Sequence, residues 1–306
     1  MAFLPEIGSR QWLSAHRVVA DVQGGNECVA MEAIMRERLR QHIQGWRGRL
    51  PLEWREFLAQ SPEPNFEALP MENPLGAVDG PLFPALLDAV ANPAFAGPHL
   101  LRAFDGIAPT DVRVVLIGQD PYPNQDRATG RAFEDGLWDG VRTQDIAVSL
   151  KPILLAALST TPGYGDYFRP KQWDRIRSRL QANQLVMPDI QQFFDHLADQ
   201  GVLCVNAAWT YSGPQVLELH LALWRPVMIF LLRALANREE GSTTFLALGA
   251  KACDLLDASV EEGAENINRI KRDHARQMRL VHNPLAEIDA WLVNRGEAPI
   301  SWWPPN

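Results

Sequence analysis

Three side chains that could do chemistry each stand at the end of a short apolar run of the sequence. They are the carboxylate of Asp120, the amide of Asn206 and the imidazole of His282. A carboxylate can orient a water molecule, an amide can both donate and accept hydrogen bonds, and an imidazole can donate to an oxygen that gains charge. One polar residue at a strand end needs no function, but three such residues together favour a site.

The runs before these residues are rich in β-branched and aliphatic side chains, as is typical of strands buried on both faces of a parallel sheet. We predict strands at 112–117, 202–205, 243–248 and 278–281, which alternate with helices at 147–159, 189–200, 221–237, 250–258 and 287–294. This alternation predicts an α/β fold, a three-layer sandwich with a central, mostly parallel four-stranded sheet flanked by helices. Because ligands bind such sheets beyond the carboxyl ends of the strands, Asp120, Asn206 and His282 should gather at one edge.

The length and composition of the chain indicate one large domain. Its 306 residues are 46% hydrophobic, which suits a catalytic domain at 46–306 after an N-terminal extension at 1–45. We see no apolar run long enough to span a membrane and no signal peptide in the first 21 residues. We therefore expect a cytoplasmic protein without a membrane partner, and a monomer.

The charge and the cysteines exclude some classes of function. A net charge of −8 argues against a protein that coats nucleic acid non-specifically. A local basic face can still exist, and its candidates, which can equally be an ordinary charged helix surface, are Arg269, Lys271, Arg272, His274, Arg276 and Arg279. The three cysteines do not stand at metal-ligand spacing and are too few for an iron–sulfur cluster, so we read them as thiols: Cys28, Cys204 and Cys253.

Several segments resemble, in the same order, those of the uracil-DNA glycosylase superfamily. The most specific is Gly118-Gln119-Asp120-Pro121-Tyr122, which is similar to the loop with which that family activates water. The others are Gly130-Arg131-Ala132-Phe133, Ser149-Leu150-Lys151, Gly201 to Asn206, His220 with Trp224, Phe245 to Gly249, His282-Asn283-Pro284-Leu285 and Gly296 to Trp302. With weaker similarity upstream, the resemblance covers roughly four-fifths of the chain, from about Trp54 to Trp302.

The resemblance implies a monofunctional DNA N-glycosylase that releases a flipped-out uracil or modified pyrimidine and leaves an abasic site. Breaking this bond leaves positive charge on the sugar and negative charge on the base, and the enzyme must stabilise both. The resemblance gives Asp120 the role of facing the sugar and orienting the attacking water. It gives His282 the role of donating to the carbonyl oxygen of the leaving base.

The remaining motif residues would bind the DNA. The resemblance implies that the base is bound by Gln119, Tyr122, Phe133 and Asn206, with Phe133 stacking on its ring and Tyr122 at the C5 edge of the pyrimidine. It implies that DNA is contacted by Ser149, Lys151, Pro284 and Leu285, with Leu285 as the side chain that is wedged into the duplex. It implies no metal and no organic cofactor.

Three departures from the family concern the rim of this site. Pro123 stands where the family commonly has a histidine, so a polar contact near the water or the phosphate is lost. The loop that begins at His282 is shortened, and the loop after Asn206 carries the aromatics Trp209 and Tyr211. These changes fit a preference for single-stranded or distorted DNA. They also fit a bulky modified pyrimidine of the kind found in phage DNA, and thus a role in antiviral defence.

Two other classes of function compete with an active glycosylase. A DNA-binding relative without catalysis could act as a sensor or partner protein, but the presence of Asp120, Asn206 and His282 argues against it. A nucleotide hydrolase would need a glycine-rich phosphate loop or clustered metal carboxylates, and the sequence has neither. The motifs contain one lysine, Lys151, and it does not follow a strand, so a Schiff base and lyase activity are not expected.

Overall fold

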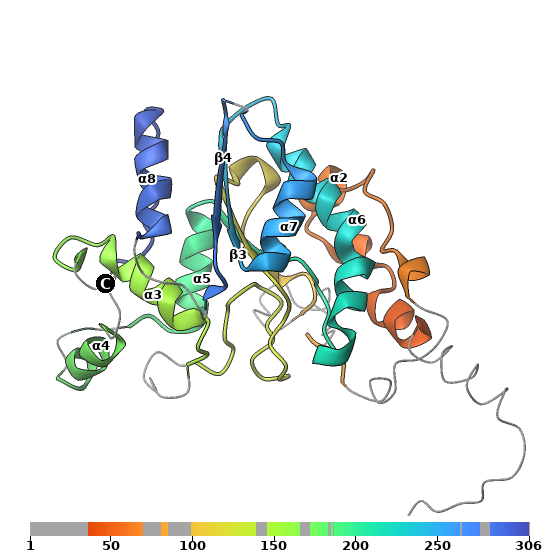
Figure 1. The fold of residues 1–306 in the computed structure, drawn as a ribbon, viewed down its shortest axis with the longest axis horizontal. Coiled ribbons are helices and arrows are strands. Elements are labelled where there is room, and N and C mark those ends of the chain that lie inside the picture. Colours follow the sequence, from red (N-terminus) through yellow and green to blue (C-terminus); the bar gives the residue numbers. More distant parts are fainter. Residues whose placement is uncertain are drawn as a thin grey trace, which may run out of the picture.

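The computed structural model describes residues 36–69, 81–84, 99–138, 146–165, 172–182, 185, 187–263, 265–275 and 282–305 (Figure 1). Four strands among these residues form one sheet in the order β2-β1-β3-β4, and every neighbouring pair is parallel. The strands are β1 (Val114–Gly118), β2 (Val202–Asn206), β3 (Thr243–Leu248) and β4 (Ile267–Arg272). The predicted α/β class, with a parallel four-stranded sheet between layers of helices, is confirmed.

Helices cover both faces of the sheet (Figure 1). One face packs against α3 (Leu150–Ser159), α5 (Ile190–Asp199) and α8 (Pro284–Asn294), and the other against α2 (Leu52–Phe57), α6 (Leu217–Ala236) and α7 (Ala250–Ser259). Successive side chains of β1 point to opposite faces of the sheet. Val114 and Leu116 pack in the core with α3, α5 and α8, and Val115 and Ile117 pack in the core with α2, α6 and α7. A helix that we did not predict, α4 (Gln172–Gln181), contacts α3.

The fourth strand is not at the predicted position. Residues 276–281, which contain all of the predicted strand 278–281, lie outside the described residues, and the strand next to β3 is Ile267–Arg272. This strand is at the edge of the sheet and mixes Ile267 and Ile270 with charged neighbours, and only Ile270 is fully buried. Charged residues are typical of edge strands, so a search for apolar runs misses them.

The described part of the predicted N-terminal extension belongs to the core. Residues 36–43 are helical, and Leu39 and Ile43 are buried in the same cluster as Trp46. Trp46 in turn makes edge contacts with Trp209 and Trp224, whose ring centroids lie 5.5 and 6.0 Å away. The packed domain therefore begins before the predicted boundary at residue 46, while residues 1–35 lie outside the described residues.

We expected no apolar run long enough to span a membrane, but the segment Pro214–Ala236, which contains α6, is such a run. By length and composition alone it could cross a membrane, with a mean hydropathy of 1.5. However, α6 lies against the sheet and buries Leu223, Trp224, Val227 and Met228 in the core. Its packing therefore accounts for its apolar composition.

Candidate active site

The carboxyl ends of β1 and β2 meet at Gly118 and Asn206, which are partners in the sheet register. A side chain on Gly118 would overlap the amide oxygen of Asn206, so glycine at this position leaves room for the Asn206 amide. The following loops are tied together by bonds of 2.9 Å from the Ala207 N–H to the Gly118 carbonyl and from the Ala208 N–H to the Gln119 carbonyl. These contacts hold the residues after both strands at one edge of the sheet.

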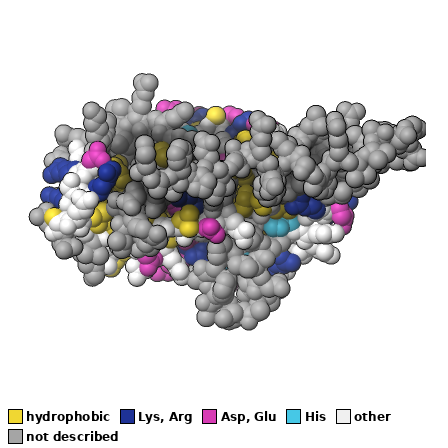
Figure 2. All heavy atoms as spheres, turned by 90° about the horizontal axis from the view of Figure 1, so that it is seen from below, with side chains coloured by type: hydrophobic (Ala, Val, Ile, Leu, Met, Phe, Trp, Pro, Cys, Tyr) yellow, Lys and Arg dark blue, Asp and Glu magenta, His cyan; other side chains and the backbone are white. Residues whose placement is uncertain are grey.

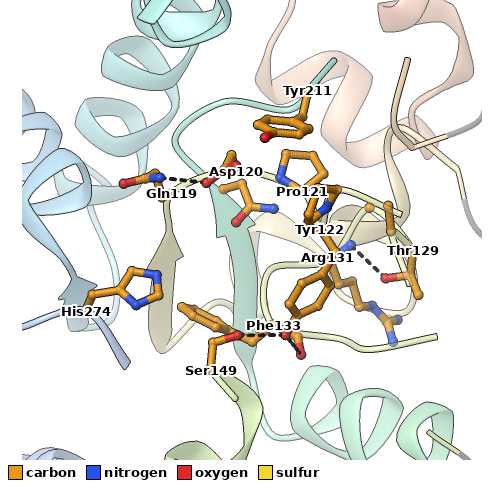
Figure 3. Close-up of a pocket in the computed structure, with 14 residues that line it drawn as sticks. Gln119, Asp120, Pro121, Tyr122, Thr129, Arg131, Phe133, Ser149, Tyr211 and His274 are labelled. Atoms are coloured by element: carbon orange, nitrogen blue, oxygen red, sulfur yellow. Dashed lines mark hydrogen bonds between the residues drawn. The ribbon is translucent and has the colours of Figure 1, made fainter. Parts of the chain in front are cut away.

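A pocket of about 390 Å³ opens at this edge (Figure 3). Its size is within the range of small-molecule sites, roughly 300–1,000 Å³. Six of the ten predicted site residues line it, namely Gln119, Asp120, Tyr122, Phe133, Ser149 and Asn206. The other lining residues are Pro121, Pro123, Ala128, Thr129, Gly130, Arg131, Tyr211 and His274.

Asp120 is the carboxylate of this pocket. The Gln119 side-chain amide donates a hydrogen bond of 2.8 Å to its Oδ1 atom, which leaves Oδ2 without a protein donor among the described residues. Burial raises the pKa of the Asp120 carboxyl above its ordinary value, and the hydrogen bond from Gln119 opposes that rise. A desolvated carboxylate of this kind interacts more strongly with a nearby positive charge than one in water does.

Phe133 forms a flat wall of the pocket and has a constrained backbone. Its φ angle is 66°, which is rare for a residue with a side chain. The preceding Ala132 N–H donates to the Cys204 carbonyl at 3.2 Å, and the following Glu134 forms a buried ion pair with Arg102 at 2.8 Å. The loop is therefore fixed on both sides of Phe133, as its unusual conformation requires.

The Tyr122 hydroxyl connects two other parts of the pocket wall. It donates to the Phe133 carbonyl at 3.2 Å and lies 3.0 Å from the Ser149 hydroxyl (Figure 3). Ser149 immediately precedes α3 and is buried. These contacts hold the Tyr122 ring against the pocket.

The imidazole of the pocket belongs to His274, a residue to which we gave no catalytic role. His274 follows β4 by two residues, just as Asp120 follows β1 by two. It lies against Gly249 at the end of β3, because a Cβ atom on Gly249 would be 3.3 Å from the His274 side chain. In Figure 3 its ring points into the same space as Asp120 and Phe133.

His282, the imidazole that we predicted, is exposed and does not line the pocket. The next residue, Asn283, donates to the Ala156 carbonyl and the Ser159 hydroxyl, both at 2.9 Å, near the end of α3. Ser149, at the opposite end of α3, is the residue that lines the pocket. At 1.5 Å per residue these two ends are roughly 15 Å apart, so the structure does not bring His282 into the pocket with Asp120 and Asn206.

The structure also places the predicted wedge away from the pocket surface. Pro284 and Leu285 form the buried first turn of α8, and Leu285 is only 3% exposed in the core beneath the sheet. A side chain that is packed in this way is not available to enter a DNA duplex. The predicted phosphate contact Lys151 does not line the pocket; it lies on α3 with its ammonium 5.7 Å from the centre of the Trp173 ring.

Replacing Leu285 with alanine should therefore affect stability rather than DNA opening. We expect the free energy of unfolding to fall by about 2–5 kcal/mol, because the change leaves a cavity in the core. Chemical denaturation measures this loss, and Leu52→Ala, at a leucine that is 61% exposed, is the control. If Leu285→Ala kept full stability and lost activity only on duplex DNA, Leu285 would be the wedge after all.

The basic face suggested by the sequence is largely neutralised by acids. Arg269 and Lys271 both pair with Asp257, and Arg272 pairs with Glu287. Arg276 and Arg279 lie outside the described residues. On the part of the surface that Figure 2 colours, basic and acidic side chains are interspersed, so this view shows no single basic patch.

The two aromatics of the loop after β2 have different places. Trp209 is buried in the core, where its ring stacks on Trp224 at a centroid distance of 4.5 Å. Tyr211 lines the pocket. Sequence spacing alone did not distinguish them.

The described residues contain no cluster of three histidine, cysteine, aspartate or glutamate side chains that could hold a metal ion. Two of the cysteines, Cys204 and Cys253, are free, and burial raises the pKa of the Cys204 thiol to about 12. Cys28 lies outside the described residues.

Comparison with known proteins finds similar chains, although no family model matches. The uracil-DNA glycosylase of Lacticaseibacillus casei (strain BL23) is 25% identical over 210 residues, covering 68% of this chain and 78% of that one. The uracil-DNA glycosylase of Bordetella parapertussis is 28% identical over 261 residues, covering 83% and 87%. The crystal structure of wild-type UNG from Nitratifractor salsuginis superposes with a TM-score of 0.54 at 20% identity, over 84% of this chain and 94% of that one, and has the same fold.

Proposed function

We infer that this chain, a divergent member of the uracil-DNA glycosylase superfamily, hydrolyses the N-glycosidic bond of a flipped-out pyrimidine in DNA and leaves an abasic site. The observation that carries this proposal is the convergence of Asp120, Asn206, His274 and Phe133 on one pocket. Together these four groups can stabilise the sugar, which becomes positively charged as the bond breaks, and bind the base, which becomes negatively charged. In this proposal the protein acts as a monomer and forms no covalent bond to the DNA.

Asp120 and His274 act on the two opposite charges of the transition state. The sugar becomes positively charged as the bond breaks, and the ionised Asp120 stabilises it and accepts the proton of the attacking water. The electron pair of the bond leaves with the base, and His274 donates a hydrogen bond to the oxygen on which that charge collects. Both groups act more strongly because the pocket is partly shielded from water.

Phe133 and Asn206 bind the base itself. The Phe133 ring offers a stacking surface, an interaction worth about 1–3 kcal/mol per base. The Asn206 amide has a donor and an acceptor, so it can pair with the Watson–Crick edge of a pyrimidine. Among the described residues no group forms a hydrogen bond with this amide, which leaves it available for the base.

Uracil is the base that the pocket supports best. Tyr122 is held in place by the Phe133 carbonyl and Ser149, and we propose that its ring closes the side where a C5 substituent would project. A bulky modified pyrimidine, as in phage DNA, is the second candidate, and the presence of Pro123 and Tyr211 in the pocket lining favours it. The test is incubation with DNA that carries uracil, thymine or bulky pyrimidines, single-stranded and duplex, with released base identified by mass spectrometry. Release of no base from any substrate would instead support a DNA-binding relative without catalysis.

Tyr122→Ala should relax the choice of base. If the ring blocks the C5 edge, its removal lets a methyl group enter, and we expect thymine release to become measurable while uracil release slows. Tyr122→Phe is the matched control, because it keeps the ring and loses only the hydroxyl contacts. Mass spectrometry of the released base measures both, and a Tyr122→Ala variant that still refuses thymine while it releases uracil would contradict this role.

A further inference from the structure

One polar group in the pocket has no part in the mechanism described so far, the hydroxyl of Tyr211. The Tyr211 side chain is only 6% exposed and lines the same pocket as Asp120. No described residue forms a hydrogen bond with its hydroxyl. Figure 3 shows the Tyr211 ring above Pro121, with the hydroxyl on the side of Gln119 and Asp120.

The position of Tyr211 is fixed from two directions. Its backbone N–H donates to the Phe83 carbonyl at 3.0 Å and its carbonyl accepts from the Phe83 N–H at 2.8 Å. Its ring stacks on the buried His220 at a centroid distance of 6.5 Å. The Thr210 and Ser212 hydroxyls, which flank Tyr211 in the chain, lie 2.8 and 2.9 Å from the two ring nitrogens of His220. A loop fastened in this way positions a side chain for a specific contact.

The hydroxyl is a neutral polar group beside a carboxylate. Burial, and then the negative charge of Asp120, raise the pKa of the Tyr211 phenol, so it keeps its proton at neutral pH. Both side chains line the same pocket. Pro121 and Pro123 line the same pocket and offer neither a side-chain polar group nor an N–H.

An attacking water needs more than one fixed partner. An ordered water at a buried polar site makes roughly two to four hydrogen bonds. The orientation of the water molecule is fixed when each of its two hydrogens has an acceptor. Asp120 supplies one acceptor, since its other oxygen is bonded to Gln119. The lone pair of the water points at the sugar when a second acceptor takes the other hydrogen.

We propose that Tyr211 is a further catalytic residue, whose hydroxyl oxygen holds the attacking water together with Asp120. As the C–N bond breaks, its electron pair leaves with the base, and the water oxygen forms the new bond to the anomeric carbon. The proton of that water passes to the Asp120 carboxylate, while Tyr211 keeps its own proton throughout. This inference rests on the proposed function.

Tyr211→Phe tests the proposal because it removes one oxygen atom and keeps the ring that stacks on His220. We expect single-turnover release of uracil from a uracil-containing oligonucleotide to slow about tenfold, the effect of one lost hydrogen bond in the transition state. Affinity for the uncleaved oligonucleotide, measured in the Asp120→Asn background, should stay within twofold. Tyr164→Phe is the matched control, since it also removes a tyrosine hydroxyl and keeps the ring, but at a residue that does not line the pocket, and it should behave like the wild type.

A double variant separates water positioning from a structural role. If both residues act through one water, adding Tyr211→Phe to Asp120→Asn should slow release less than twofold further, because effects within one unit are not additive. Full additivity would overturn the inference, as would a Tyr211→Phe rate equal to that of the wild type, or an equal loss of rate and affinity. If the wild-type protein released no base at all, the proposed function itself would be contradicted. That result differs from the ones above, which concern only the role of Tyr211.

Discussion

Asp120→Asn should slow base release by about 10²–10³-fold, while affinity for uncleaved DNA changes less than twofold. The substitution keeps the shape of the side chain and its contact with Gln119 but removes the negative charge. That charge stabilises the sugar only when the bond breaks, so its loss lowers the rate and not the binding. Single-turnover kinetics together with fluorescence anisotropy on a uracil-containing oligonucleotide measure the two quantities.

The pH dependence gives a second signature of Asp120. The carboxylate has to be ionised to act, so activity should fall as the pH falls through its pKa, which burial places above the ordinary value. The Asp120→Asn variant should lack this acidic limb. A rate like that of the wild type in this variant would overturn the mechanism.

Stability provides the control for Asp120→Asn. For an acid whose pKa is raised in the folded state, the stabilising contribution is present below the unfolded pKa and is lost as the pH rises through the folded pKa. At neutral pH the ionised Asp120 therefore opposes folding, and its removal should leave the free energy of unfolding unchanged or higher. Thermal unfolding at pH 7 checks this, so that a slower variant cannot be explained by misfolding.

His274→Ala should produce a loss of similar size, about 10²–10³-fold in the rate of base release. The imidazole donates to the oxygen of the leaving base, where charge collects only as the bond breaks. Binding of the uncleaved oligonucleotide should therefore change much less than the rate. His274→Gln, which keeps a donor at the same place, should recover part of the loss.

His282→Ala is the matched control for His274→Ala. Both remove an imidazole from the same part of the chain, but only His274 lies in the pocket, while His282 is exposed near the end of α3. We expect His282→Ala to release base within twofold of the wild-type rate. The opposite result, a large loss for His282→Ala and none for His274→Ala, would restore the assignment that the sequence suggested.

The sequence by itself determined three of the four strands of the sheet and most of the pocket. The buried strands β1, β2 and β3 are largely apolar runs, and such runs can be recognised directly in the sequence. Parallel strands bring their carboxyl ends to one edge, so Asp120 and Asn206 could be placed together without coordinates. Phe133 and Ser149 came with them through their motifs and do line the pocket.

Only the tertiary structure decided which histidine completes the pocket and what happens to the predicted wedge. Strand β4 lies at the edge of the sheet and contains charged residues, so it was not recognised as a strand in the sequence. For that reason His274, which follows β4, was not predicted as a site residue. Leucine is a suitable residue type for a wedge, but the side chain of Leu285 is buried in the core of the domain. Trp209 and Tyr211 are also separated only by the tertiary structure. Trp209 packs on Trp224 in the core, whereas Tyr211 lines the pocket with Asp120. The packing of distant segments, which no local pattern encodes, decides which side chains remain available for chemistry.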